Sequence, residues 1–171
     1  MDGESHDWPR QLRRYVGQEL EVRPVFNRPS RRCPDLLGIV PGQVRRMEHP
    51  HVMAVIDTSA SITTDDLRQI SAELRRMKRT NKVTVVECDV QIRSVYPLRE
   101  DIREVHGRGG TDLRPPFEPA FLRQHNPDVV VYFTDGNGPA PDQAPPLPVI
   151  WCLTQRGKVG VNWGRVIKMQ S

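Results

Sequence analysis

Short, mostly apolar runs recur along the chain from residue 51 onward, separated by stretches of mixed polarity. Such runs are typical of strands that are buried on both faces of a parallel sheet. The sequence contains four of them, at residues 52–56, 83–88, 129–134 and 149–153. Two further strands are expected. One, at 91–96, follows the previous run after a tight turn and is therefore expected to be antiparallel, and a short last strand is expected at 165–169.

Helices are expected between these strands. Apolar residues recur at helical spacing between positions 67 and 77, after two threonines and two aspartates that suit a helix N-terminus, so this helix should run to about residue 79. A helix marked by prolines is expected near 115–125, and a short amphipathic helix near 8–16. The alternation of strands and helices predicts a layered α/β fold with a mostly parallel sheet.

Proline is abundant, at 16 of 171 residues, and most prolines fall between positions 24 and 50 or between 115 and 148. Proline lacks the N–H group that a helix interior or a central strand needs, so these stretches are expected to be loops or extended connections. The chain is therefore expected to consist of an N-terminal helix with an extended basic leader, residues 1–50, and one α/β domain, residues 51–171.

Composition argues against several classes of protein. No apolar run reaches ten residues, so no membrane-spanning segment is expected, and the polar N-terminus does not resemble a signal peptide. We expect a cytoplasmic protein whose three cysteines, none in a CxxC pair, stay reduced. The net charge of +4 invites a nucleic-acid partner, but most of the basic residues are arginine, an imbalance that often reflects genomic base composition.

Polar residues follow two of the apolar runs at their carboxyl ends. Asp57 opens an Asp-Thr-Ser-Ala-Ser segment, in which Ser59 and Ser61 add hydroxyls at alternate positions. Asp135 opens Asp-Gly-Asn-Gly, and Thr111 lies between the two segments in a Gly-Gly-Thr-Asp loop. In open α/β sheets, ligands bind beyond the carboxyl ends of the strands, where the strand order reverses. These segments are therefore expected to meet in one crevice.

The two carboxylates and three hydroxyls form a ligand set that contains only oxygen. Such a set suits Mg²⁺ or Mn²⁺ in octahedral geometry rather than zinc or copper. Neutral hydroxyl ligands leave the ion with excess positive charge, so it can bind one more anionic oxygen, such as a carboxylate of another protein. Each motif alone has a simpler explanation, as a helix cap or an ordinary turn, but their joint order favours a metal site.

In this order, the three segments resemble the metal-ion-dependent adhesion site (MIDAS) of von Willebrand factor A (VWA) domains. Over residues 8–169 the chain is similar to one branch, the VWA-like C-terminal domain of a prokaryotic family described as predicted metal-dependent peptidases. The matching features are Asn-Arg-Pro-Ser-Arg-Arg at 27–32, Val-Pro-Gly at 40–42, Gly-Gly-Thr-Asp at 109–112 and Trp-Gly-Arg-Val-Ile at 163–167. The resemblance implies a three-layer, Rossmann-like VWA fold, with one antiparallel edge strand and helices on both faces of the sheet.

The resemblance also implies a role for each site residue. Ser59 and Ser61 would coordinate the divalent ion directly, and Asp57 would do so directly or through water. Thr111 would be a further ligand, and Asp135 would be linked to the site by water. The implied function is a protein-interaction module that captures a partner's Asp or Glu carboxylate, similar to the VWA partners of MoxR-type AAA+ ATPases.

Some features depart from the family or support the site only indirectly. Ala60 stands where a glycine usually separates the two serines, and the proline-rich residues 138–146 do not suit the helix that many VWA domains have there. Asp112 is expected to support the loop of Thr111 and not to bind the ion. The peptidase name of the family rests on a separate N-terminal half, and this chain contains no His-Glu-x-x-His motif, so we do not transfer the name.

Two other functions stay open. One is a metal-assisted hydrolase or peptidase-associated domain that uses the ion as a Lewis acid. His106 is its single candidate base, and no Walker A or GxSxG motif is present, so a binding module is expected rather than an enzyme. The other is nucleic-acid binding through the basic leader, against which the aromatic content of 6% argues. The leader's arginines are Arg28, Arg31, Arg32, Arg45 and Arg46.

Overall fold

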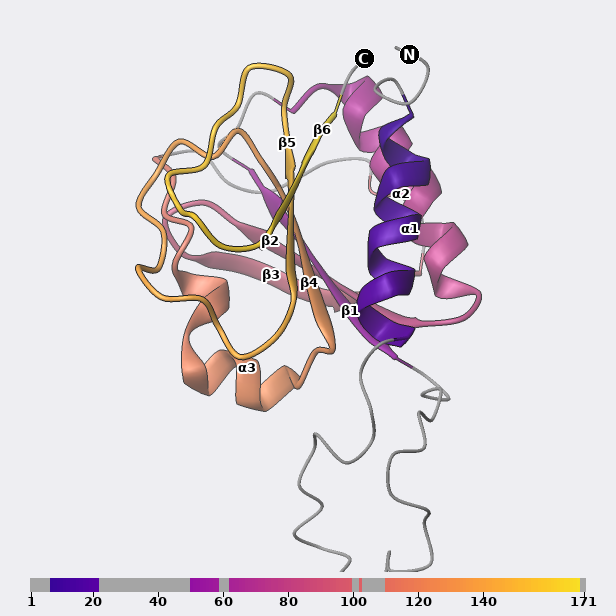
Figure 1. Cartoon of the computed structure of the whole chain (residues 1–171), viewed down its shortest axis with the longest axis horizontal. Coiled ribbons are helices and arrows are strands. Elements are labelled where there is room, and N and C mark those ends of the chain that lie inside the picture. Colours follow the sequence, from indigo (N-terminus) through magenta and orange to yellow (C-terminus); the bar gives the residue numbers. More distant parts are fainter. Residues whose placement is uncertain (1–6, 22–49, 59–61, 100–101, 103–109, 170–171) are drawn as a thin grey trace, which may run out of the picture.

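The computed structural model describes residues 7–21, 50–58, 62–99, 102 and 110–169. These residues form a six-stranded sheet with helices on both faces (Figure 1). The strands are β1 (His51–Asp57), β2 (Lys82–Cys88), β3 (Ile92–Pro97), β4 (Val129–Thr134), β5 (Val149–Leu153) and β6 (Arg165–Lys168). The helices are α1 (Trp8–Glu21), α2 (Thr64–Lys78), the short 3-10 helix η3 (Pro115–Phe117) and α3 (Pro119–His125).

The order of the strands in the sheet is β3-β2-β1-β4-β5-β6. Within the described residues, β3 alone is antiparallel, to β2, and the other neighbours pair in parallel. The predicted α/β fold, with a mostly parallel sheet and one antiparallel edge strand, is therefore confirmed. The strand order reverses between β1 and β4, so the crevice in which such sheets bind ligands lies at the carboxyl ends of these two strands.

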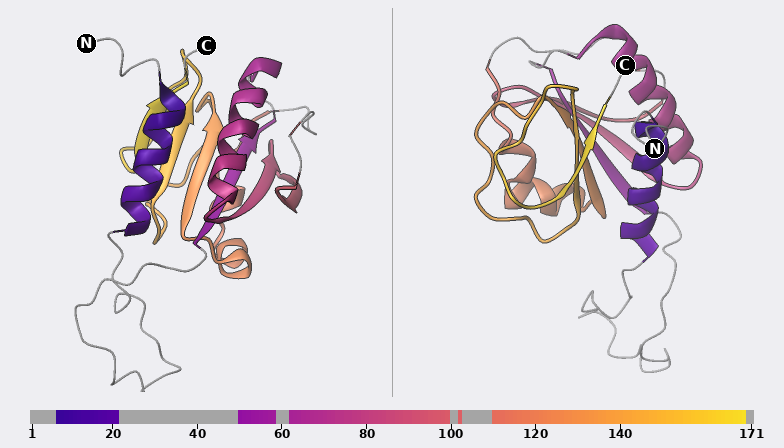
Figure 2. Two further views of the ribbon diagram at one scale, coloured as in Figure 1. Left: turned by 90° about the vertical axis from the view of Figure 1, so that its right-hand side faces the viewer. Right: turned by 45° about the horizontal axis from the view of Figure 1, so that its top comes forward.

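Helices α1 and α2 lie side by side over one face of the sheet (Figure 2). Trp8, Leu12 and Val16 of α1 are at most 3% exposed, and the Trp8 ring meets that of Phe133 on β4 edge to face, with their centroids 6.2 Å apart. The helix is longer than the predicted residues 8–16 and forms part of the core of the α/β domain. The arginines of the leader fall between positions 22 and 49, outside the described residues.

The other face of the sheet carries η3, α3 and two long loops, residues 135–148 and 154–164, which lie on the left of Figure 1. An aromatic cluster packs beneath them. The Phe117 ring centroid lies 5.7–5.8 Å from those of Tyr132, Trp151 and Trp163. The structure describes the whole of loop 135–148 and contains no helix there, so the prediction from its prolines is confirmed.

Two polar contacts join α1 to α2. Trp8 Nε1 donates a hydrogen bond of 2.9 Å to Gln69 Oε1, and Arg13 Nε lies 2.8 Å from Glu73 Oε1. Glu73 is 2% exposed, and its burial raises the pKa of the carboxyl, a shift that the Arg13 guanidinium opposes only in part. The surroundings of the Glu73 carboxyl therefore favour its neutral, protonated form over the charged one.

Replacing Leu12 by alanine should lower the free energy of unfolding by about 2–5 kcal/mol, because the buried side chain would leave a cavity against the sheet. Chemical denaturation followed by circular dichroism measures the change. Arg14→Ala on the exposed side of α1 is the control and should cost less than about 1 kcal/mol. Equal losses in the two variants would contradict the placement of α1 in the core.

Glu73→Gln should become more favourable, relative to the unmodified protein, as the pH rises. The raised pKa means that folded Glu73 binds its proton more tightly than unfolded Glu73 does. The contribution of this carboxyl to stability is therefore fully present below the unfolded pKa of about 4.5. It decreases as the pH rises, and the loss is complete above the folded pKa. Denaturation of both proteins between pH 4 and pH 7 measures this trend, and a difference that does not change with pH would contradict it.

Candidate metal centre

The carboxylate of Asp57 is held between the two central strands. Asp57 ends β1 and Thr134 ends β4, one position beyond the paired residues Ile56 and Phe133. The Thr134 hydroxyl donates a hydrogen bond of 2.6 Å to Asp57 Oδ2 and accepts one of 3.0 Å from the backbone N–H of Gly136. Both side chains are fully buried. The Asp57 carboxylate therefore has a defined orientation at the point where the strand order reverses.

Asp135 follows β4 directly and is half-buried. The backbone N–H of Asn137 donates to its Oδ1 at 3.0 Å, and the backbone N–H of Lys158 donates to its carbonyl oxygen at 3.0 Å. The turn after it needs glycine at position 136, because the backbone there has φ +79° and a Cβ would overlap the carbonyl oxygen of Lys158. The chain therefore bends sharply after Asp135, as the Asp-Gly-Asn-Gly segment indicates.

Thr111 lies against the loop that follows Asp135. A Cβ on Gly138 would lie 2.7 Å from the carbonyl oxygen of Thr111, so the two segments can approach this closely because position 138 has no side chain. Two residues along, the backbone N–H of Leu113 donates to the carbonyl oxygen of Pro139 at 2.8 Å. The structure thus brings together the Thr111 loop and the Asp135 loop at the carboxyl edge of the sheet.

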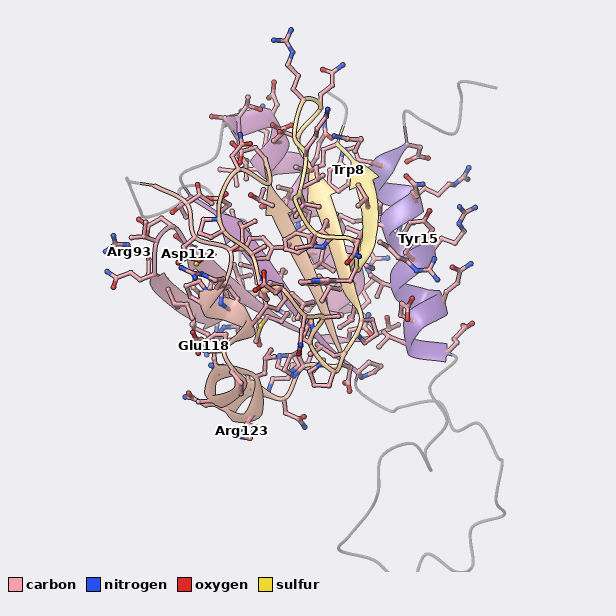
Figure 3. The ribbon with its side chains drawn as sticks, turned by 60° about the vertical axis from the view of Figure 1, so that its left-hand side comes forward. Trp8, Tyr15, Arg93, Asp112, Glu118 and Arg123 are labelled. Atoms are coloured by element: carbon pink, nitrogen blue, oxygen red, sulfur yellow. The ribbon has the colours of Figure 1, made fainter. Side chains whose placement is uncertain are left out.

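Two pairs of aspartate and arginine support this loop. Arg114 Nε and Nη2 each lie 2.9 Å from an oxygen of Asp112 and hold the pKa of that carboxyl below its usual value. Asp112 N–H donates to the carbonyl oxygen of Asp89 at 2.9 Å, and both carboxylate oxygens of Asp89 lie 2.9 Å from Arg93 Nε. Figure 3 shows Arg93 and Asp112 next to each other at this side of the domain. Asp112 has the contacts of a loop support.

The comparisons with known proteins agree with this architecture. The family model described as "VWA-like domain (DUF2201)" matches residues 52–170. The chain belongs to this family. The VWA-like domain is also similar to a Thermotoga maritima protein that carries the name "Uncharacterized protein", with 32% identity over 149 residues, which cover 82% of this chain and 36% of the relative. The chain thus spans about a third of the length of that curated relative. No solved structure matches this chain.

Two residues that the sequence analysis missed help to build the site of this VWA-like domain. Thr134 fixes Asp57, and Asp89 anchors both Arg93 and the backbone of Asp112. Both follow a signal that the sequence carries, since each is a polar residue at the carboxyl end of a buried strand. Of the five predicted site residues, Asp57, Thr111 and Asp135 lie around one edge, and Ser59 and Ser61 lie outside the described residues.

The donor atoms described at this edge of the VWA-like domain are oxygens. Among the residues that the structure describes, no three His, Cys, Asp or Glu side chains form a group that could hold a metal ion. Cys88 pairs with Asp57 in the register of β1 and β2, but burial raises the pKa of its thiol to about 12, so it stays protonated. The described carboxylates and hydroxyls fit a hard divalent cation and not a soft one.

The histidine at the start of β1 does not contribute to this edge. His51 begins β1, at the opposite end of the strand from Asp57, where its Nε2 lies 2.7 Å from Thr84 Oγ1 and burial lowers the pKa of its ring. His106 lies outside the described residues, as do the arginines of the leader. Among the helices that the structure describes, none has the length and apolar character needed to cross a membrane.

Thr134→Val should lower the free energy of unfolding by about 1–3 kcal/mol, because Asp57 Oδ2 and the N–H of Gly136 would both lose a buried hydrogen bond. Thr134→Ser keeps the hydroxyl and is the matched control. Denaturation in buffer with EDTA measures both variants without a contribution from metal. Equal stability of the two variants would show that the hydroxyl does not hold Asp57.

Proposed function

We propose that this VWA-like domain is a metal-dependent protein-interaction module, which binds Mg²⁺ or Mn²⁺ at a MIDAS and captures a carboxylate of a partner protein. The observation that carries the proposal is the convergence of Asp57, Thr111 and Asp135 at the carboxyl ends of β1 and β4. Ligands of open α/β sheets bind at this position, where the strand order reverses. The family membership supports the same reading.

In this proposal each residue at the edge has a separate task. Asp57 at the end of β1 holds the ion together with Ser59 and Ser61 of the following segment. Thr111 adds a hydroxyl from the loop that packs on Gly138. Asp135 joins the site through water. Because the ion's described protein ligands would be carboxylates and hydroxyls, it suits Mg²⁺ or Mn²⁺.

Residues outside the ligand set keep the ligands in place. Thr134 orients the Asp57 carboxylate through a short hydrogen bond, as partners of metal ligands commonly do. Arg114 holds the Asp112 carboxylate, which keeps this acid beside Thr111 out of the ligand set. When bound, the ion supplies a positive centre that attracts an anionic oxygen. A surface Asp or Glu of another protein is the simplest such oxygen, and a MoxR-type AAA+ ATPase is the first partner to test.

Calorimetry on protein stripped with EDTA should show binding of about one Mg²⁺ or Mn²⁺ per chain. Asp57→Ala should abolish binding, and Thr134→Val should weaken it by about 10–100-fold, because it removes the partner that orients the ligand. Glu118→Ala is the control, because it removes an exposed carboxylate that caps α3 through its backbone only. Binding that survives in Asp57→Ala, or no binding by the folded protein, would contradict the proposal.

The same variants separate metal binding from partner capture. Binding of a MoxR-type ATPase encoded in the same genome should require Mg²⁺ and should disappear in Asp57→Ala and in EDTA. Capture that persists in EDTA would show that the interaction uses another surface of the domain.

A further inference from the structure

A groove of about 770 Å³ lies between the two long loops on the α3 side of the sheet. Residues 138–140 and Asp142 of the β4–β5 loop form one wall, and residues 159–162 of the β5–β6 loop form the other. A cavity of this volume is within the range of about 300–1,000 Å³ that is typical of ligand sites. The groove exists because glycine-rich and proline-rich loops, and no helix, cover this part of the sheet.

One end of the groove meets the proposed metal site. Gly138, which lines the groove, is the residue that packs against Thr111. The two walls are joined here, since the backbone N–H of Lys158 donates to the carbonyl oxygen of Asp135 at 3.0 Å. From the other side, the ammonium group of Lys168 on β6 donates to the carbonyl oxygen of Gly157 and anchors the second wall. A chain that placed a carboxylate at the metal would therefore stand at the mouth of the groove.

Near Asp142, Trp163 joins the loops that form the two walls. Trp163 Nε1 donates to the carbonyl oxygen of Pro141 at 3.2 Å, and the Trp163 ring packs on Phe117 in the core. Asp142 lies beside this contact and is exposed. The loop from Asp135 at the site to Asp142 in the first wall spans at most about 25 Å if it were fully extended.

The lining combines apolar side chains with polar groups. Val159, Val161 and Ala140 are half-buried and pack against the core beneath the groove. Among the lining residues, all of which the structure describes, Asp142 alone carries a charge. Arg114 interacts with Asp142 electrostatically, but its Nε and Nη2 atoms are bound to Asp112. The groove thus offers three apolar side chains that pack on the core, polar atoms along its walls and a negative charge at Asp142.

We propose that the groove binds the segment of the partner protein that flanks its metal-binding carboxylate. The occupant is an extended chain with small or apolar side chains between the walls and a Lys or Arg side chain at Asp142. The inference rests on the proposed metal site. Because the loop from Asp135 to Asp142 spans at most about 25 Å, the basic residue should lie within about seven residues of the acid, always on the same side of it. The groove would thereby select one chain direction, which a single ion cannot do.

Gly160 offers a way to fill the groove without disturbing the fold. It lines the groove, and a Cβ at this position would meet nothing within 4 Å. Gly160→Phe should therefore place a ring between the walls. Gly17 on α1 is a matched control, because a Cβ there also meets nothing within 4 Å and the helix covers the opposite face of the sheet.

The experiment selects phage-displayed peptides of random sequence, each with one fixed central aspartate, on the immobilised full chain in Mg²⁺. We expect enriched peptides to carry Lys or Arg on one fixed side of the aspartate, with small or apolar residues between. A synthetic copy of an enriched peptide should bind Gly160→Phe about tenfold or more weakly, because the ring occupies its place, and bind Gly17→Phe unchanged. Asp142→Asn should remove the preference for the basic residue.

Calorimetry with Mg²⁺ on the unmodified chain, Gly160→Phe and Gly17→Phe separates the two proposals. If all of them bind the ion but no peptide is enriched, or if enriched peptides bind Gly160→Phe as tightly as the unmodified chain, the groove proposal is overturned and the metal site stands. If the unmodified chain binds no ion, the proposed function fails first and the groove proposal fails with it.

Discussion

The burial of the Asp57 carboxylate is the constraint on which the rest of the candidate site depends. A charged group removed from water is costly unless other groups meet it. The Thr134 hydroxyl meets one of its oxygens, and that hydroxyl is oriented in turn by the N–H of Gly136. The contact requires β1 and β4 to be neighbours, so a single hydrogen bond ties the site to the reversal of strand order.

The two faces of the sheet are covered by different kinds of structure. On one face, two amphipathic helices bury apolar stripes and join through Trp8, Gln69, Arg13 and Glu73. On the other face, prolines prevent a helix between β4 and β5, and the loops are held by hydrogen bonds to carbonyl oxygens and by aromatic packing. Loops leave gaps that a packed helix would fill, and this is the physical origin of the groove beside the site.

The candidate site and the groove therefore arise from the same two loops. The β4–β5 loop begins with Asp135 at the site and continues as one wall of the groove, while Gly138 allows the close approach of Thr111. In the proposed function, the ion supplies attraction for any carboxylate, whereas the groove restricts which chain can present it. Affinity and selectivity would then depend on different residues, which is why substitutions in the groove can be separated from those at the metal.

Much of the fold could be predicted from the sequence, because local patterns of apolar and polar residues indicate strands and helices. The apolar runs, the capped start of α2, the antiparallel strand after a tight turn and the loop at 138–146 were all correct. The positions of Asp57 and Asp135 at strand ends, and of Thr111 in a glycine loop, came from the same local information. The metal-binding roles of Ser59 and Ser61 stay predictions.

The tertiary structure decided which of these local features come into contact. The spacing of apolar residues in α1 predicts an apolar face, but it does not predict that Trp8 packs on β4. The pattern does not specify which element the face contacts. The role of Thr134 depends on the register of β1 and β4. The role of Asp89 depends on the loop that brings the N–H of Asp112 to its carbonyl oxygen. The groove lies between segments some twenty residues apart. Contacts between distant parts of the chain follow from strand order and packing, which no short stretch of sequence encodes.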